Sequence, residues 1–209
     1  MKARHAIVLP ALLVAVEAMA DDHEFGYEIT PFAGYRFGGE FEEDGGPDTV
    51  EVDDGGSFGL ILNGPDSSET QWEILYSYQA AQADTTAVPG IGASNDLDIH
   101  YFQLGGTYQW DGRVARPFLS AGVGGTHINP DAGALESDTF WSFSIGTGLQ
   151  FRPGERWGVR VEARAFATLT DSDSRLFCQS GIEGGQCAFL IDGDVFWQVE
   201  AFAGLIFRF

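Results

Sequence analysis

The sequence predicts an all-β fold, an eight-stranded antiparallel transmembrane up-and-down barrel. Three observations predict it: hydrophobicity alternates with period two along the chain, short and long connections alternate, and the chain ends in a long alternating segment. Side chains on a strand point alternately to opposite faces, so such segments can place one face against lipid and the other inside a barrel. After residue 20, no stretch approaches the roughly 18 consecutive apolar residues of a membrane-spanning helix.

Residues 1–20 have the pattern of a cleaved secretory signal. Lys2 and Arg4 precede an apolar run over 6–16, and small residues at 18–20 resemble a cleavage site. We therefore expect two parts, a signal peptide at 1–20 and an outer-membrane β-barrel at 21–209.

Eight period-two segments follow one another in order. The seventh alternates most regularly, because Val159 and Val161 share one face while Arg160 and Glu162 share the other. The last is also regular, since every odd position from Val195 to Phe209 is apolar. The second is the weakest pattern. The predicted strands are 25–37, 56–63, 69–79, 97–110, 116–128, 139–151, 157–169 and 195–209.

The connections between these segments alternate in length. Those at 63–68, 111–115 and 152–156 are tight turns rich in Gly, Pro and Asp. Outer-membrane barrels have short periplasmic turns and longer outside loops. We therefore expect a protein of the bacterial outer membrane with both termini on the periplasmic side. The longer connections are 38–55, 80–96, 129–138 and 170–194.

Charge and cysteine content narrow the range of partners. The formal net charge is -20, and all nine basic residues after residue 20 are arginines. Nucleic-acid binding needs clustered cations, so this class of partner is excluded. Cys178 and Cys187 lie close together in an exported chain, which favours a local disulfide between them.

Charged side chains recur on the face of the strands that would point into the barrel. An unpaired charge in a dry interior is very costly, so we expect these side chains to pair with one another. The predicted arrangement is an ionic cluster that closes the lumen, in which Arg164 can approach Glu200 or its diagonal neighbours. Its predicted centre is Arg160, Glu162, Arg164, Glu200 and Arg208. The alternative is a gate or selectivity ring in a narrow channel. The predicted lumen cluster comprises Glu28, Arg36, Glu73, Arg160, Glu162, Arg164, Glu200 and Arg208.

Eight strands enclose an interior about wide enough for side chains to fill. Five phenylalanines occupy inward positions and narrow it further, and inward glycines leave room for the larger side chains. A filled lumen is therefore favoured over a conducting pore. These phenylalanines are Phe32, Phe118, Phe140, Phe166 and Phe202.

The first long connection is strongly acidic. Carboxylate oxygens suit calcium or magnesium, but the spacing of a calcium-binding loop is absent. We interpret the segment as a solvated loop, with a divalent cation bridging it to surface glycolipid as the alternative. Its acidic residues are Glu40, Glu42, Glu43, Asp44, Asp48, Glu51, Asp53 and Asp54.

Candidate catalytic residues are few. His100 and His127 fall near the outer ends of adjacent strands, so they could approach each other. Asp98 shares the face of His100, which leaves a hydrolase as an alternative, since catalysis needs a nucleophile and a base within hydrogen-bond reach. We assign no catalytic residue, no cofactor-binding residue and no metal ligand.

Several stretches resemble the small eight-stranded outer-membrane β-barrel family, in its gammaproteobacterial, porin-like branch. They are 29–37 (ITPFAGYRF), 75–79 (LYSYQ), 103–108 (QLGGTY), 116–122 (RPFLSAG), 171–174 (DSDS) and 203–209 (AGLIFRF). The resemblance implies an eight-stranded barrel without a catalytic motif. It also implies that Phe207 and Phe209 form a C-terminal assembly signal for the barrel assembly machinery.

We therefore expect an integral outer-membrane protein with a plugged lumen and a structural or surface-interaction role without catalysis. The first alternative is a narrow porin-like channel for small solutes, and the second is a surface lipid-modifying or proteolytic barrel enzyme. The expected partners are outer-membrane lipid, surface glycolipid and the barrel assembly machinery. The protein is expected to be a monomer without a cofactor.

Overall fold

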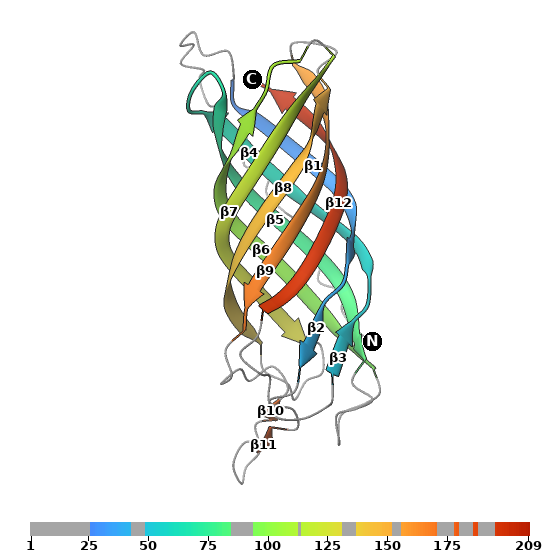
Figure 1. Ribbon diagram of the computed structural model, residues 1–209. Helices are drawn as coiled ribbons and strands as arrows, with labels where there is room; N and C mark the ends of the chain where they lie inside the picture. The colour runs from blue at the N-terminus through green and yellow to red at the C-terminus, as the bar shows by residue number, and fades with distance from the viewer. Residues whose placement is uncertain are drawn as a thin grey trace, which may run out of the picture.

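Eight long strands close an antiparallel barrel in the computed structural model (Figure 1). It describes residues 26–42, 49–84, 94–112, 114–130, 137–151, 156–170, 178–179, 186–187 and 195–209. Around the barrel the order is β5-β4-β1-β12-β9-β8-β7-β6, and β6 pairs with β5 to close the ring. The strands are β1 (Glu28–Phe37), β4 (Gly55–Pro65), β5 (Thr70–Asp84), β6 (Ser94–Gln109), β7 (Ala115–Pro130), β8 (Asp138–Phe151), β9 (Trp157–Leu169) and β12 (Val195–Arg208).

This closed ring confirms the predicted fold class. Even the weakest segment, 56–63, forms a full strand, β4, between β1 and β5. The signal peptide predicted at 1–20 lies outside the described residues. Within the part of the chain that the structure describes, no helix is long and apolar enough to cross a membrane.

The two ends of the barrel differ. One end, here the short-turn end, carries the connection at 66–69 and the C-terminus, while β2 and β3 lie at the opposite, long-connection end (Figure 1). The backbone N–H of Phe209 donates to the carbonyl of Tyr27 at 3.1 Å. The last residue is thereby tied to the start of β1.

The strands run further into the long connections than predicted. β5 continues past Gln79 to Asp84, and β6 begins at Ser94 rather than at residue 97. Ala81 and Ala83 in this extension are buried, and Ala81 pairs with the buried Leu97. Apolar packing inside the wall therefore prolongs the β5–β6 pair beyond the expected strand ends.

The first long connection also contains strands that were not predicted. β2 (Glu40–Glu42) and β3 (Thr49–Val52) pair in the same register as β1 and β4, so they continue that hairpin outward. Gly38 and Gly39 interrupt it with φ values of 75° and 126°, a conformation that favours glycine. The connection expected at 38–55 as a solvated loop therefore contains two short strands, β2 and β3. Residues 43–48, with three of the acidic side chains, lie outside the described residues.

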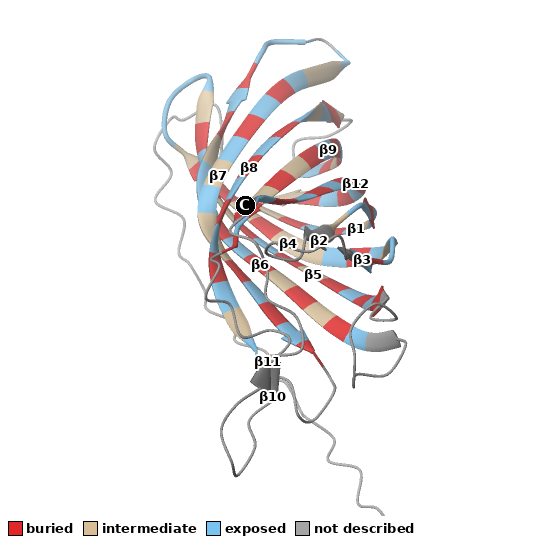
Figure 2. Ribbon diagram, turned by 60° about the horizontal axis from the view of Figure 1, so that its bottom comes forward, coloured by how far each residue is buried: buried red, intermediate tan, exposed pale blue. Residues whose placement is uncertain are grey.

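Burial alternates along most of the length of the long strands, as the bands in Figure 2 show, although β4 has two adjacent buried residues, Asn63 and Gly64. On β9, Arg160 and Glu162 are buried, whereas Val161 between them is exposed. The outward side chains are largely apolar, as a lipid-facing wall requires. The predicted facing of β9 is therefore confirmed.

Aromatic pairs gather on the outer wall near each end. Such girdles mark the two interfaces of a membrane-spanning barrel, because aromatic side chains with polar edges suit the headgroup level. The pairs are Tyr27–Trp72, Tyr108–Trp110 and Trp157–Phe207 at the short-turn end, and Tyr35–Phe37 and Phe58–Tyr78 at the long-connection end.

A two-stranded sheet stands apart from the barrel. β10 (Cys178–Gln179) pairs antiparallel with β11 (Gln186–Cys187), and the register sets Cys178 opposite Cys187. Directly opposed residues of an antiparallel pair have Cα atoms about 4.5–5.5 Å apart, within the range that a disulfide spans. The backbone register is compatible with the predicted disulfide, which stays a prediction.

Candidate functional site

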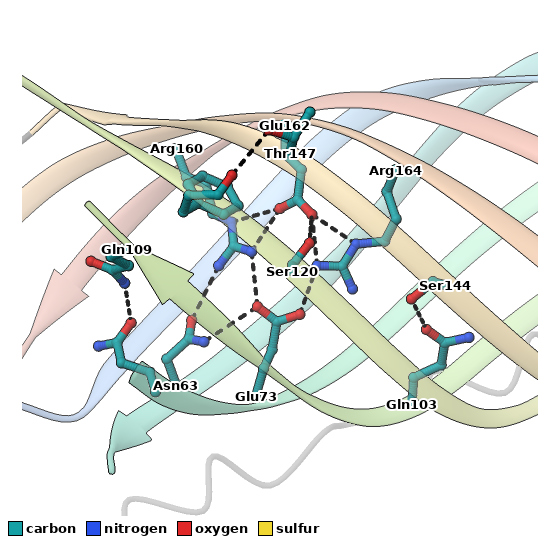
Figure 3. Close-up of polar contacts among 12 residues, drawn as sticks. Asn63, Glu73, Gln103, Gln109, Ser120, Ser144, Thr147, Arg160, Glu162 and Arg164 are labelled. Atoms are coloured by element: carbon teal, nitrogen blue, oxygen red, sulfur yellow. Dashed lines mark hydrogen bonds and ion pairs between the residues drawn. The ribbon is translucent and has the colours of Figure 1, made fainter. Parts of the chain in front are cut away.

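Four charged residues form the centre of the lumen. Glu73 on β5 receives Arg160 Nη2 at 2.8 Å and Arg164 Nη2 at 2.6 Å through its two carboxylate oxygens (Figure 3). Glu162, between the two arginines on β9, receives both of them at 2.7 Å. All four side chains are buried. We call this group the central cluster.

The central cluster spans the width of the barrel. β5 and β9 are four places apart in either direction around the ring of eight strands, so they form opposite walls. The pairs of Glu73 with Arg160 and Arg164 therefore cross the lumen rather than linking neighbouring strands.

Uncharged side chains complete the central cluster. Asn63 on β4 accepts from Arg160 at 3.3 Å and donates to Glu73 at 3.3 Å, and Ser120 on β7 donates to Glu162 at 2.6 Å. Neither Asn63 nor Ser120 is among the residues predicted to line the lumen. Both lie at inward positions of their strands, so the alternation that selected the charges could also have selected them.

A second polar layer lies toward the long-connection end. Arg36 on β1 pairs with Glu200 on β12 at 3.0 Å and also donates to Ser77. The Arg36 guanidinium carbon lies 4.7 Å from the ring centroid of Tyr101, a cation–π distance. Tyr101 Oη donates to Gln198 Oε1 at 2.9 Å. β6 and β12, which carry this last bond, are also opposite walls.

The ends of the lumen differ in character. At the short-turn end, Arg208 Nη2 pairs with Glu28 Oε1 at 2.6 Å, and the Arg208 side chain keeps 21% of its surface exposed. Beyond the second layer, toward the long-connection end, the interior becomes apolar. The buried side chains there include Val52, Ala81, Leu97, Ile99, Ile128 and Phe196.

The eight charges predicted to line the lumen balance. The eight residues predicted to line the lumen are four arginines and four glutamates, and each takes part in an ion pair. Burial of an ion costs several kcal/mol, which close pairing offsets only with good geometry and additional hydrogen bonds. The network meets both conditions in the central cluster. The protein's net charge of -20 is therefore carried by the rest of the chain.

The pairing differs from the predicted one in two respects: Arg164 does not pair with Glu200, and Glu200 and Arg208 lie outside the central cluster. Arg164 was expected to approach Glu200, and the two are indeed directly opposed in the β9–β12 register. The Arg164 side chain instead reaches Glu73 and Glu162, while Glu200 receives Arg36. The eight charges therefore form three groups: the central cluster, Arg36–Glu200 and Arg208–Glu28.

Inward glycines make room for these large side chains. A Cβ atom at Gly148 would lie 2.7 Å from the Phe118 ring, and one at Gly146 would collide with the Glu162 carboxylate. Arg160 in turn stacks on Phe118, with its guanidinium carbon 4.4 Å from the ring centroid. All five predicted inward phenylalanines are buried.

The histidine pair lies on the outer wall. His100 and His127 are directly opposed on β6 and β7, with ring centroids 6.2 Å apart. Asp98 accepts from Tyr78 Oη at 2.6 Å, and His100 Nδ1 bonds Tyr76 Oη at 3.0 Å, so both have partners other than each other. Among the described residues, no three His, Cys, Asp or Glu side chains are grouped to hold a metal ion.

Comparisons with known proteins agree with this geometry. The family model described as outer membrane protein beta-barrel domain matches residues 6–184. Neisserial surface protein A is 13% identical with a TM-score of 0.60, covering 88% of this chain and 97% of its own. The outer membrane protein OprG from Pseudomonas aeruginosa is also 13% identical, with the same coverage and a TM-score of 0.55. None of the curated proteins matches the sequence. At such identity the solved structures show the fold alone.

Proposed function

Because the chain belongs to the outer membrane protein beta-barrel family, and so resides in the bacterial outer membrane, we propose that it is a closed barrel with a structural or surface-interaction role and without catalysis. The single observation that carries this proposal is the central cluster, whose ion pairs join opposite walls of the lumen. A second cross-lumen contact, Tyr101 to Gln198, supports it.

The energetics favour a lumen that stays closed. Opening a path past Glu73 would leave Arg160 and Arg164 with fewer partners in the interior. Removing one partner of a buried pair costs about 3–5 kcal/mol, which would make spontaneous opening rare. The apolar layer around Ile99 and Phe196 adds a second barrier toward the long-connection end.

The proposal includes an orientation. The short-turn end, with the C-terminus, faces the periplasm, and the long connections face outward, as is usual for outer-membrane barrels. Exposed Phe209 then lies at the periplasmic interface, together with Phe207 and Trp157. We propose that Phe207 and Phe209 form the assembly signal for the barrel assembly machinery, and that the barrel functions as a monomer in contact with outer-membrane lipid.

A catalytic role lacks support from the histidines. In the described structure the contacts of Asp98 and His100 lead to separate tyrosines, Tyr78 and Tyr76, rather than joining them as an acid–base pair. The acidic first connection, for which a divalent cation was the alternative, is described only in part, and its described residues form no group of three metal ligands.

Solute flux through proteoliposomes tests the closed lumen. Wild-type protein should leave liposomes as impermeable to small sugars and amino acids as protein-free liposomes. Arg160→Ala combined with Glu73→Ala removes both sides of the cross-lumen contact and should produce measurable swelling. Swelling by the wild type would instead support a narrow solute channel.

A further inference from the structure

Three outward rows of side chains cross β6, β7 and β8 near the long-connection end. The register sets His100, His127 and Thr139 in the outermost row, and Phe102, Gly125 and Trp141 in the next row toward the short-turn end. Leu104, Val123 and Phe143 form the third. The rows thus change from polar to apolar within two steps along the strands.

The centre of the middle row has no side chain. Gly125 lies between Phe102 and Trp141, whose side chains are 55% and 69% exposed. The missing side chain leaves a hollow of about 490 Å³ over Gly125, which is lined by these two rings and by Leu104 and Val123. Its lining is mainly apolar, and Thr139 forms its border with the polar row. The shape and lining suit a hydrocarbon chain that lies along the wall.

The polar row continues onto β5 and has the composition of a sugar-binding surface. His127 Nδ1 and Thr139 Oγ1 share a hydrogen bond of 2.8 Å, and His100 Nδ1 shares one of 3.0 Å with Tyr76 Oη. The Tyr78 ring lies 4.9 Å from that of His100. Aromatic rings beside neutral and ionised hydrogen-bonding groups can stack on a sugar ring and bind its hydroxyl groups.

Local charge argues against a bare phosphate as the principal contact. Asp98 lies on the same strand as His100 and accepts from Tyr78, and the Asp138 carboxylate accepts from the backbone N–H of Thr139. The Asp98 carboxylate lies on the outward face of β6, as His100 does, whereas Asp138 is opposite the buried Ile128, so an anionic headgroup without a sugar would meet the like charge of Asp98. A headgroup rich in hydroxyls would not.

We propose that this surface binds an acylated glycolipid of the outer leaflet, with one acyl chain in the Gly125 hollow and a sugar ring on the Tyr78–His100–His127–Thr139 row. The inference rests on the proposed orientation only for the leaflet that supplies the lipid. The binding surface itself is a property of β5 to β8. This inference assigns the expected contact with surface glycolipid to one binding site on the barrel wall.

Gly125→Leu is the sharpest perturbation. A Cβ atom at Gly125 would have no neighbour closer than 3.7 Å, so the barrel accepts a side chain that fills the hollow. Gly56→Leu is the matched control: Gly56 is an exposed glycine on β4 near the same end, and a Cβ atom there meets nothing within 4 Å. His127→Phe, which keeps a ring but removes its nitrogens, tests the polar row.

Binding is measured in detergent micelles by native mass spectrometry, with a hexa-acylated glucosamine disaccharide, its deacylated form and phosphatidylglycerol as probes. We expect preferential retention of the acylated disaccharide by wild type and Gly56→Leu. Gly125→Leu should weaken it about tenfold, the loss expected when roughly two methylene groups lose contact. His127→Phe should reduce the preference over phosphatidylglycerol.

Equal retention of phosphatidylglycerol and the disaccharide by wild type would overturn the proposal, as would equal binding by Gly125→Leu and Gly56→Leu. Retention of the deacylated disaccharide at full strength would exclude a role for the hollow. Liposome swelling is recorded on the same preparations. If wild-type protein shows no glycolipid selectivity but its liposomes stay impermeable, only this inference is contradicted. If wild-type liposomes swell, the closed lumen is contradicted.

Discussion

Replacing Glu73 by glutamine should destabilise the barrel strongly while changing its shape very little. Glutamine has nearly the same volume, so packing around Asn63 is retained. The substitution removes the negative charge that pairs with Arg160 at 2.8 Å and with Arg164 at 2.6 Å. The central cluster then holds two buried arginines and one glutamate, Glu162.

The expected magnitude follows from burial. Glu73 is almost fully buried, as are both arginines, so water cannot replace the missing charge. Loss of one partner from a buried ion pair costs about 3–5 kcal/mol, mainly because the opposite charge remains in the interior. The amide group of glutamine can still accept one hydrogen bond, so we expect the free energy of unfolding to fall within that range rather than above it.

Urea unfolding from lipid vesicles, followed by tryptophan fluorescence, measures this loss. The midpoint should move while the slope stays constant, because the surface exposed on unfolding is unchanged. Glu69→Gln is the matched control: Glu69 is exposed in the 66–69 connection and accepts from Tyr108 Oη, so its replacement should give no measurable change.

A double-mutant cycle identifies the cause. Arg164→Met on the Glu73→Gln background restores the charge balance, and the two changes should couple by about 1–3 kcal/mol. Equal stability of Glu73→Gln and Glu69→Gln would refute the reasoning. Simple additivity with Arg164→Met would show that the two residues do not depend on each other.

Three further predictions concern the wall, the outer sheet and assembly. Ala163→Arg, outward in the middle of β9, should cost about 2–4 kcal/mol in the same vesicle assay, against about 0–1 for Val195→Arg at the end of β12, and equal costs would contradict the assigned membrane depth. Cys178 and Cys187 should form a disulfide, so the unreduced, unfolded protein should take up no thiol label in mass spectrometry, and two labels would disprove it. Deletion of Phe209 should reduce the amount of heat-modifiable, folded protein in outer-membrane fractions, and normal assembly would count against the C-terminal signal.

The fold could be predicted from the sequence because alternation in a membrane barrel has a direct physical cause. Each outward position of β9 and β12 must suit lipid, so polar residues such as Arg160 and Glu200 are restricted to the inner face. The pattern at 56–63 is weak because β4 carries Gly56 and Gly59, which contribute no side chain to either face. Its neighbours β1 and β5 supply the register that the segment itself does not show.

The ion pairs inside the lumen were harder to predict than the identity of the side chains that face it. Alternation assigns a face to Arg164, but not the direction in which its long side chain extends. The nearest backbone neighbour on β12 is Glu200, yet the Arg164 side chain reaches Glu73 on the opposite wall. That contact depends on the closure of the ring, which brings β5 and β9 face to face across the lumen.

The strands at the long-connection end, β2 and β3, were also not predicted. The segment containing β2 and β3 reads as an acidic loop, because repulsion among carboxylates and the glycines at 38–39 argue against pairing. In the structure β3 pairs with β5, and Val52 is buried. Long-range pairing therefore overrides the local preference, and a single sequence carries no signal for it.

Planar-bilayer conductance tests the closed lumen most directly. Purified wild-type protein should insert without producing steady current steps, because ion pairs cross the lumen in the central cluster. Glu200→Ala, which removes the ion-pair partner of Arg36 in the second layer, should raise the frequency of openings. Steady, reproducible channels from the wild type that Glu200→Ala leaves unchanged would contradict the account and favour a solute channel.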